Sequence, residues 1–532
     1  MSSVRPPAGG IDPAELETTL RVLADLGDLD EVHPDFIRVR QATAGMFKAV
    51  KKQRRLDKRA IVAEADRRVV AATATGAPDR IDDETRGIPV SIPGAVKEVA
   101  GSLNSKPRDP VVENDDPPAS PSAGTLLRAR ACYICKQQYT VVDAFYHQLC
   151  PACALLNHAK RQARTDLTGK GALLTGGRAK IGMYIALRLL RDGAHTTITT
   201  RFPRDAVRRF ASLPDSGEWM HRLRIVGIDL RDPAQVIGLA DDIAAAGPLD
   251  ILINNATQTV RRSPGAYQPL VDAERAPLPD GPLPEIVTFG HVSDAHPLAL
   301  ARSVGAHPIL AAAARSNADT AGTGGEPVPR TPGQRAAAHL TEQALTAGST
   351  SLDRLAAGTA IDAGGLVPDL HGANSWTQRV DEVDALEMLE VQLANTTAPF
   401  ILISRLRASM AASPARRTYV VNVSAMEGVF GRGYKGPGHP HTNMAKAAVN
   451  MLTRTSAREM FETDGILMTS VDTGWITDER PHPTKVRLAE EGFHAPLDLV
   501  DGAARVYDPI VRGEAGEDVF GIFLKDYGPS SW

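Results

Sequence analysis

The 532-residue sequence contains no apolar run long enough to span a bilayer and no signal-peptide pattern at its start. It also lacks an excess of either charge, because 60 lysines and arginines stand against 63 aspartates and glutamates, for a net charge of -3. These absences argue against a membrane protein and against a nucleic-acid-binding surface built on net charge. We therefore expect a cytoplasmic protein.

Cysteine is scarce, and its four copies all fall in the stretch "CYICKQQYTVVDAFYHQLCPAC". Cys132 and Cys135 form one C-x-x-C pair, and Cys150 and Cys153 form a second. Two such pairs can place four thiolates around one ion, and four thiolates leave no open position for catalysis. The spacing predicts a structural zinc knuckle, with free thiols or redox pairs as the alternatives. The knuckle would either dock a partner or stabilise a small domain.

Composition divides the chain into several regions. Residues 1–75 carry leucines at helical spacing, and residues 76–128 form a polar, proline-bearing linker that we expect to be disordered. The zinc knuckle follows at 129–163. A strand and helix alternation then fills 164–532, interrupted at about 258–373 by a proline-rich, glycine-rich and alanine-rich insertion, which we expect to be partly helical and partly disordered.

The stretch "KGALLTGGRAKIGMYIALRLLRDGA" reads as a strand, a glycine turn and a helix. Further strands are expected at "AHTTITT", "LRIVGIDL" and "LDILINNA". A helix that starts at the carboxyl end of a parallel strand can bind phosphate through its free N–H groups. The pattern predicts an α/β fold with a doubly wound Rossmann-type parallel sheet, an N-terminal helical arm and a small zinc-binding module.

These motifs resemble the short-chain dehydrogenase/reductase family. That family has a T-G-x-x-x-G-[IL]-G turn, an Asp-Leu pair after the third strand and N-N-A-G after the fourth. The resemblance covers about 167–260 and 374–527, roughly half the chain. It implies that the cofactor is bound by Thr175, Gly176, Arg178, Lys180, Ile181, Gly182, Arg201, Asp229, Leu230, Asn255, Ala256, Lys446, Gly474 and Thr477.

The resemblance also indicates which cofactor is bound. Arg201 directly follows the second strand, where an acidic residue would favour a free 2′-hydroxyl and a basic one favours a 2′-phosphate. Arg178 and Lys180 add positive charge nearby, so NADP is favoured over NAD. Two residues depart from the pattern: Lys180 replaces the middle glycine of the turn, and Thr257 replaces the glycine after the fourth strand. The Lys180 side chain would either crowd the cofactor or bind a phosphate.

The catalytic half departs further. Asn395 matches the asparagine that supports the family's catalytic lysine through water, and Lys446 matches that lysine. Thr442 stands where the family has its tyrosine, and an alkyl hydroxyl does not ionise near neutral pH. Ala425 holds the position of the active serine. Ser424, one residue earlier, can serve only if the end of the strand kinks.

Three residues in the loop before Thr442 are candidates to replace the missing acid: Tyr434, His439 and His441. An imidazole can act as a general acid near neutral pH. The other interpretation is that all three make only structural contacts in the loop. In "VDTGWITDE", Thr473 replaces the proline of the family's next motif.

We therefore expect an atypical NADP-dependent oxidoreductase that acts on a small-molecule carbonyl or alcohol. The alternative is a non-catalytic nucleotide-binding sensor or scaffold, which docks a protein partner through its zinc module. A homo-oligomer is compatible with either reading, and nucleic acid is not expected as a partner.

Overall fold

The computed structural model describes residues 10–78, 80, 121–262, 264–289, 293, 296–297, 364–366, 369, 371–431, 433, 435–477 and 479–532. The chain divides into two compact units. One comprises Met1–Arg68 with Leu126–Arg128, and the other comprises Val69–Thr125 with Ala129–Trp532.

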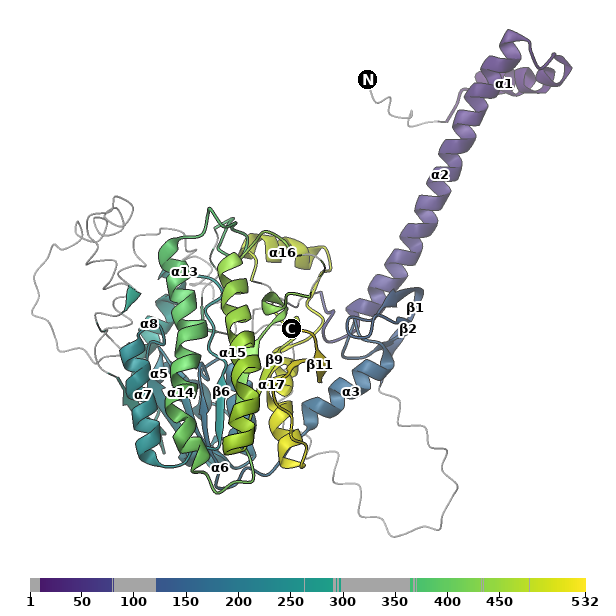
Figure 1. Cartoon of the computed structure of the whole chain (residues 1–532). Coiled ribbons are helices and arrows are strands. Elements are labelled where there is room, and N and C mark those ends of the chain that lie inside the picture. Colours follow the sequence, from purple (N-terminus) through teal and green to yellow (C-terminus); the bar gives the residue numbers. More distant parts are fainter. Residues whose placement is uncertain are drawn as a thin grey trace, which may run out of the picture. The chain divides into compact units, whose positions relative to one another are not determined.

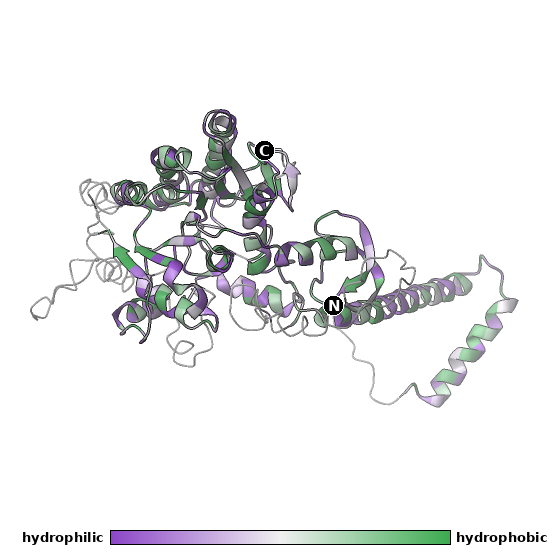
Figure 2. Cartoon of the chain, turned by 90° about the horizontal axis from the view of Figure 1, so that it is seen from below, coloured by the Kyte–Doolittle hydropathy of each residue, from purple (hydrophilic) through white to green (hydrophobic). Residues whose placement is uncertain are grey.

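The N-terminal helical arm that the sequence predicts is present. Helix α1 (Pro13–Asp25) begins after Asp12, whose side chain accepts a hydrogen bond from the Ala14 N–H at 2.8 Å and so caps the helix. Helix α2 (Pro34–Ala71) follows after a short 3-10 turn (Figure 1). Hydrophilic residues run along much of α2 (Figure 2), and α1 buries none of its residues.

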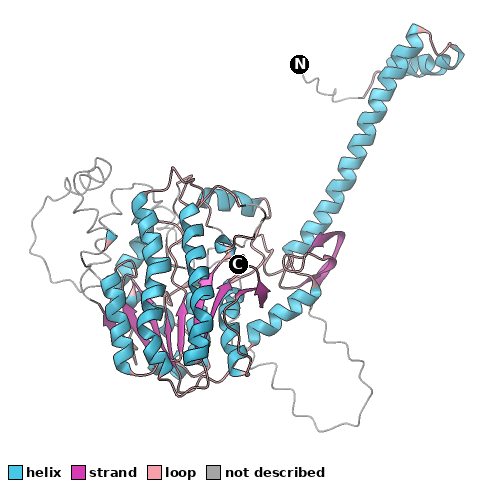
Figure 3. Cartoon of the chain, viewed as in Figure 1, coloured by secondary structure: helices cyan, strands magenta, loops and turns pink. Residues whose placement is uncertain are grey.

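The second unit contains a nine-stranded sheet in the order β11-β10-β9-β8-β6-β3-β4-β5-β7 (Figure 3). Every neighbouring pair is parallel except the hairpin of β10 and β11. The predicted doubly wound α/β fold is therefore confirmed. The strands are β3 (Gly171–Leu174), β4 (His195–Thr200), β5 (Leu223–Gly227), β6 (Ile251–Asn254), β7 (Glu285–Thr288), β8 (Thr418–Ser424), β9 (Ile466–Asp472), β10 (Phe523–Lys525) and β11 (Gly528–Ser530).

Helices cover both faces of this sheet. Side chains alternate between the faces: Tyr419 and Val421 pack in one core cluster with α4 and α17, whereas Val420 packs in the other with α7, α14 and α15. Figure 1 shows α7, α14 and α15 in front of the sheet. The helices are α4 (Lys180–Arg191), α5 (Pro203–Ala211), α6 (Ser216–Trp219), α7 (Pro233–Ala246), α8 (Gln268–Arg275), α13 (Ala385–Gln392), α14 (Ala398–Ala411), α15 (Pro440–Asp464), α16 (His482–Glu490) and α17 (Leu499–Glu514).

None of the helices in the described ranges combines the length and the apolarity that a bilayer crossing requires.

The four cysteines lie in the second unit, and the secondary structure around them starts earlier than predicted. Strands β1 (Ser122–Ala131) and β2 (Gln138–Asp143) form an antiparallel hairpin, and helix α3 (Pro151–Gln162) follows. The predicted linker at 76–128 therefore extends too far, because its last residues belong to β1 and pair with β2. Residues 81–120 of that linker lie outside the described residues.

Part of the predicted insertion belongs to the sheet. Helix α8 and strand β7 both fall within 258–373, and β7 pairs in parallel with β5 from Arg224↔Glu285 to Gly227↔Thr288. The prediction treated this stretch as lying outside the sheet, which is wrong for β7. The helices predicted at "PILAAAARS" and "GQRAAAHLTEQAL" lie outside the described residues.

The strand order determines where a ligand site can form. The chain reverses its direction of strand addition between β3 and β6, which are neighbours in the sheet. In open parallel sheets the crevice at such a switch point, outside the carboxyl ends of the strands, is where ligands bind.

Candidate functional site

A tight glycine turn connects β3 to α4. Gly176 has a φ of +69°, and a Cβ built on it would lie 2.9 Å from the Ala256 Cα. A Cβ built on Gly182 would lie 2.0 Å from the Gly176 carbonyl oxygen. Both glycines are therefore required for the backbone to pack this closely, and the turn brings the start of α4 to the carboxyl end of β3.

Thr175 ties this turn to the end of β6. The N–H groups of Asn255 and Ala256 donate to Thr175 Oγ1 at 2.9 and 3.0 Å. Asn255 Nδ2 donates to the carbonyl oxygens of Thr175 and Gly176 at 3.1 and 3.2 Å. Thr175 and Asn255, predicted as cofactor ligands, thus also hold the two strand ends together.

Lys180 is the first residue of α4, in the place of the family's middle glycine. Its φ is +52°, so the backbone keeps the left-handed conformation that a glycine would adopt easily. Its position is on the wall of the cavity described next. The substitution therefore adds a cation without changing the course of the turn.

A cavity of about 390 Å³ opens at the carboxyl ends of β3, β4, β5 and β6. This volume falls in the range of ligand pockets, roughly 300–1,000 Å³. Most residues predicted to bind cofactor line it: Gly176, Arg178, Lys180, Ile181, Gly182, Arg201, Asp229, Leu230, Asn255, Ala256 and Thr477.

The two arginines predicted to recognise a 2′-phosphate have different surroundings. Arg178 donates to Asp205 Oδ2 at 2.5 Å and to the Gly364 carbonyl oxygen at 2.7 Å. Arg201 instead lies over two aromatic rings, with its guanidinium carbon 5.7 Å from the Phe202 ring centre and 5.3 Å from that of Tyr267. Among the described residues no carboxylate pairs with Arg201, so its charge is available to an anion in the cavity.

Asp229, predicted to bind the cofactor, has its carboxylate engaged in ion pairs. Arg231 NH2 lies 2.6 Å and His296 Nε2 lies 3.3 Å from its Oδ2. Burial opposes ionisation, but these partners hold the pKa of Asp229 well below its ordinary value. Arg231 also pairs with Glu390 at 2.9 Å. Asp229 therefore contributes to the wall of the cavity as part of a buried charge network.

Lys446 lies in α15 and contacts the cavity wall at Thr257. Its Nζ donates to Thr257 Oγ1 at 3.0 Å and to the Val423 carbonyl oxygen at 2.9 Å. Burial lowers the pKa of Lys446 to about 8, against smaller opposing effects of Glu427 and Asp472. Thr257, one of the departures from the family pattern, is thus a direct partner of the retained lysine.

Asn395 lies in a five-residue π-helix, Leu393–Thr397, between α13 and α14. Its Oδ1 accepts from the Gln258 N–H at 2.8 Å, and its Nδ2 donates to the Gln258 carbonyl oxygen at 2.9 Å. Both ends of the amide are therefore used to hold the chain after β6. Short π-helical segments often occur at functional sites, and this one positions the residues that follow Thr257.

Ser424 is the last residue of β8. Ala425 after it keeps an extended backbone, and the chain turns only in the 3-10 turn Met426–Gly428, so the kink that the use of Ser424 requires stays a prediction. Ser424 Oγ is buried and has no hydrogen-bond partner among the described residues. Within the described part of the chain, Thr442 Oγ1 makes one long contact, 3.5 Å, to the Thr259 carbonyl oxygen.

The proposed replacements for the missing tyrosine are not gathered at the cavity. His439 stacks on Trp376 at 3.9 Å and its Nδ1 contacts the Trp376 carbonyl oxygen. His441 is buried, which lowers its pKa, and it is not among the described residues that line the cavity. It precedes Thr442 by one residue, about 100° around a helix, so it faces away from the row of Thr442 and Lys446. Tyr434 lies outside the described residues.

An ion pair that no sequence motif indicated lies on the cavity wall. Arg262 NH2 lies 3.1 Å from Glu479 Oε2, and both residues line the cavity. It joins the chain after β6 to the chain after β9, 217 residues apart. Thr477 lines the cavity next to this pair, whereas Gly474, with a φ of +80°, lies outside the lining set.

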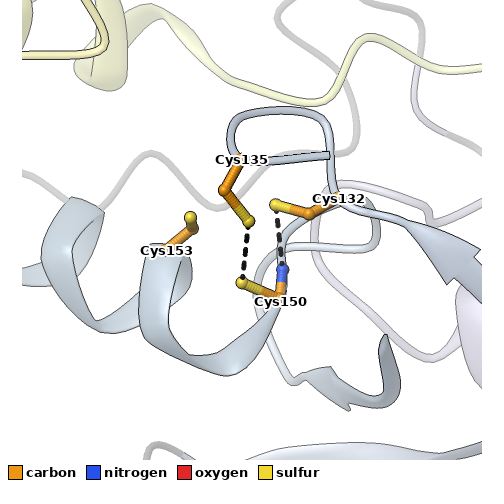
Figure 4. A group of neighbouring side chains, drawn as sticks. All are labelled: Cys132, Cys135, Cys150 and Cys153. Atoms are coloured by element: carbon orange, nitrogen blue, oxygen red, sulfur yellow. Dashed lines mark hydrogen bonds between the residues drawn. The ribbon is translucent and has the colours of Figure 1, made fainter. Parts of the chain in front are cut away.

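The four cysteines come together as their spacing predicts (Figure 4). Their Sγ atoms all lie within 4.8 Å of one another, and Cys135 Sγ is 3.7 Å from Cys150 Sγ. Four thiolates around a tetrahedral zinc ion at about 2.3 Å would be separated by about 3.8 Å. The donor set and its geometry therefore fit a metal ion.

The region around the glycine turn is similar to known proteins. Residues 170–272 match the family described as short chain dehydrogenase. A 393-residue region is 28% identical to an uncharacterized protein of Acanthamoeba polyphaga mimivirus, and covers 72% of this chain and 71% of that protein. A probable oxidoreductase of Streptomyces antibioticus is 39% identical over 94 residues, or 17% of this chain. That match spans 30% of the Streptomyces protein's length.

The chain is also similar to solved protein structures. The NADPH-bound carbonyl reductase from chicken fatty liver is matched with a TM-score of 0.39 and 15% identity, covering 69% of this chain and all of that one.

Proposed function

We propose that this chain is an NADP-dependent oxidoreductase of the short-chain dehydrogenase type, acting on a small-molecule carbonyl or alcohol at an atypical site. The observation that carries the proposal is the cavity at the β3/β6 switch point, with Arg201 presented on two aromatic rings. The match of residues 170–272 to the short chain dehydrogenase family supports the same assignment.

The residues around the cavity fit a phosphorylated dinucleotide. Gly176 and Gly182 leave open backbone where a Cβ would collide with the turn, and the free N–H groups at the start of α4 can bind a pyrophosphate. Arg201 would hold the 2′-phosphate, and Lys180 adds a second cation to the same wall. A bound nicotinamide would supply or accept the hydride.

Lys446 is our candidate for the residue that donates a proton to the substrate. Because burial lowers its pKa to about 8, the ammonium group can lose a proton near neutral pH, which the Thr442 hydroxyl cannot do. Thr257 receives a hydrogen bond from Lys446 and lies on the cavity wall, so the lysine acts on the cavity through this contact. Ser424 Oγ is buried without a described partner, but Ser424 is not among the described residues that line the cavity, so it would orient a carbonyl oxygen only in a substrate that reaches beyond them.

A carbonyl-panel assay tests this proposal. With NADPH as the reductant, the wild-type chain should consume cofactor with at least one aldehyde or ketone, and Lys446→Met should lower kcat by about 100-fold or more. Thr442→Ala serves as the control and should retain most of the activity, because the Thr442 hydroxyl makes a single long contact to the residues that the structure describes.

The same structure supports a second candidate, a nucleotide-binding sensor without catalysis. Thr442 and Ala425 replace two reacting groups together, and the Lys446 ammonium already donates to Thr257 and Val423. NADPH binding without turnover on any panel member would favour this candidate. In that case the protein partner docked by the zinc module and the oligomeric state of the chain would be determined next.

We also propose that Cys132, Cys135, Cys150 and Cys153 hold a structural zinc ion. The support is the thiol geometry at the module and the closed set of four ligands. Metal analysis of the purified chain should find one zinc per chain, and Cys132→Ser should lose it. A chain that folds with no bound metal would refute the site.

A further inference from the structure

The cysteine module makes a hydrogen bond to the loop after β9. The Trp475 N–H donates to the Tyr133 phenol oxygen at 3.0 Å. Tyr133 lies between the metal-site cysteines Cys132 and Cys135, 342 residues away in sequence. Trp475 lies in the loop Thr473–Thr477, whose last residue lines the cavity.

The turn that carries Tyr133 has a defined geometry. The Cys132 N–H donates to the Gln137 carbonyl oxygen at 2.9 Å, and the Lys136 N–H donates to the Cys132 carbonyl oxygen at 3.1 Å. The Tyr133 N–H donates to the Gln148 carbonyl oxygen at 2.8 Å. A metal held by both cysteine pairs would fix this turn further, because it links the two chain segments that form it.

The receiving loop is fixed by a second contact next to the first. Asp472, the last residue of β9, accepts from the Gly474 N–H at 3.2 Å, and its other oxygen lies 3.1 Å from Lys525 Nζ. Lys525 Nζ in turn lies 5.8 Å from the centre of the Tyr133 ring. Asp472 and Tyr133 thus hold two successive backbone N–H groups, those of Gly474 and Trp475, and so set the direction in which the chain reaches Thr477.

We propose that Tyr133 is a positioning residue for the loop Thr473–Thr477, so that metal binding at the cysteines acts on the cofactor cavity through it. Tyr133 does not touch the cavity itself. The effect of the loop on cofactor affinity rests on the function proposed above. The effect of Tyr133 on the order of the loop does not rest on that function.

Hydrogen exchange of the full, zinc-loaded chain tests the first step. In Tyr133→Phe, which keeps the ring and removes the acceptor, amides 474–477 should exchange about threefold faster or more, while the zinc content stays at one per chain. The matched control is Tyr139→Phe. Tyr139 donates its phenol proton to the His147 carbonyl oxygen within the module at 2.9 Å, so this variant should leave the loop unchanged. Unchanged loop exchange in Tyr133→Phe, or an equal change in Tyr139→Phe, would overturn the proposal.

NADPH titration and zinc removal test the second step. The Kd for NADPH should rise about threefold to tenfold in Tyr133→Phe, the effect of one hydrogen bond. Chelation should weaken NADPH binding by a larger factor in the wild type than in Tyr133→Phe, because the variant has already lost the contact through which the module reaches the loop. Equal factors in the two chains would contradict this coupling. If the wild type binds no NADPH, the proposed function fails while the exchange result still decides the role of Tyr133.

Discussion

The contact between Lys446 and Thr257 changes how the substitutions in the active site are understood. Taken singly, Thr257 is a mild replacement for glycine. In the structure its hydroxyl accepts from the Lys446 ammonium and donates to the Asn255 carbonyl oxygen at 3.2 Å. The lysine is retained, but part of its hydrogen-bonding capacity is used by a residue that the family pattern does not have.

The lowered pKa of Lys446 predicts a pH dependence of cofactor binding. Burial depresses the pKa to about 8, so the cation is present below that pH and is lost as the pH rises through it. NADPH affinity should therefore fall by about tenfold between about pH 7 and about pH 9, the effect of one charged hydrogen bond. Calorimetry at both pH values measures this. A Lys446→Met variant that shows the same pH slope would contradict the assignment.

Arg201 predicts the choice between cofactors. Arg201→Ala should weaken NADPH binding by about tenfold to 100-fold and leave NADH binding nearly unchanged, because only NADPH carries the 2′-phosphate. Arg208→Ala is the control: that arginine lies on α5, donates to the carbonyl oxygens of Ala276 and Pro277, and is not among the described cavity residues. Equal losses for both cofactors in Arg201→Ala would remove the 2′-phosphate role.

Residue types and spacing predicted which side chains could act, but not their partners. Thr257 and Lys446 are 189 positions apart, and no local pattern signals their hydrogen bond. The orientation of His441 could have been anticipated, since one step along a helix turns the side chain away from Thr442 and Lys446. Asp229 was recognisable as a residue at the end of a strand, whereas its pairing with His296 depends on a segment with no motif.

At the scale of the element, the glycine turn before α4 is the part most fully specified by sequence. Gly182→Ala should abolish NADPH binding and destabilise the chain by about 2 kcal/mol or more, because the new Cβ would meet the Gly176 carbonyl oxygen at 2.0 Å. Chemical denaturation and cofactor titration check both effects. Gly217→Ala is the matched control, since a Cβ there meets nothing within 4 Å. A Gly182→Ala variant that binds NADPH normally would contradict the account of the turn.

Strand β7 shows where element prediction ends. Its four residues, Glu285–Thr288, have a short apolar centre and lie among prolines, so their local pattern resembles a loop. The strand exists because β5 would otherwise be the edge of the sheet, and pairing satisfies its free backbone groups. This reason lies in the tertiary structure, and the sequence pattern of residues 258–373 alone does not reveal it. The strands β3 and β6 were predictable because each is a short, mostly apolar run.

Within the second unit, the cysteine module and the sheet domain are joined by buried charges. Arg161 of α3 lies 2.5 Å from Asp498 and 3.0 Å from Asp501, the two residues that form the capping box of α17. The Tyr146 hydroxyl also donates to Asp501 at 2.5 Å. The sequence predicted a zinc knuckle that docks a partner or stabilises a small domain, and these contacts, more than 300 positions apart, are not readable from it.

Metal removal should therefore destabilise more than the module. If chelation releases Arg161, two buried carboxylates lose their cation, a change that typically costs about 3–5 kcal/mol. The Tm of the full chain should fall by about 5 °C or more, measured by calorimetry with and without a chelator. In Cys132→Ser the starting Tm should already be low and the chelator should change it no further. An unchanged Tm in the wild type would show that the ion is not needed to hold Arg161 in place.

The central claim is that the cavity at the β3/β6 switch point binds NADP(H), and direct calorimetric titration of the full chain with NADPH tests it. We predict one site per chain, saturated below about 1 mM and weakened in Arg201→Ala. No binding of NADPH or NADP at millimolar concentration would contradict both the oxidoreductase and the sensor.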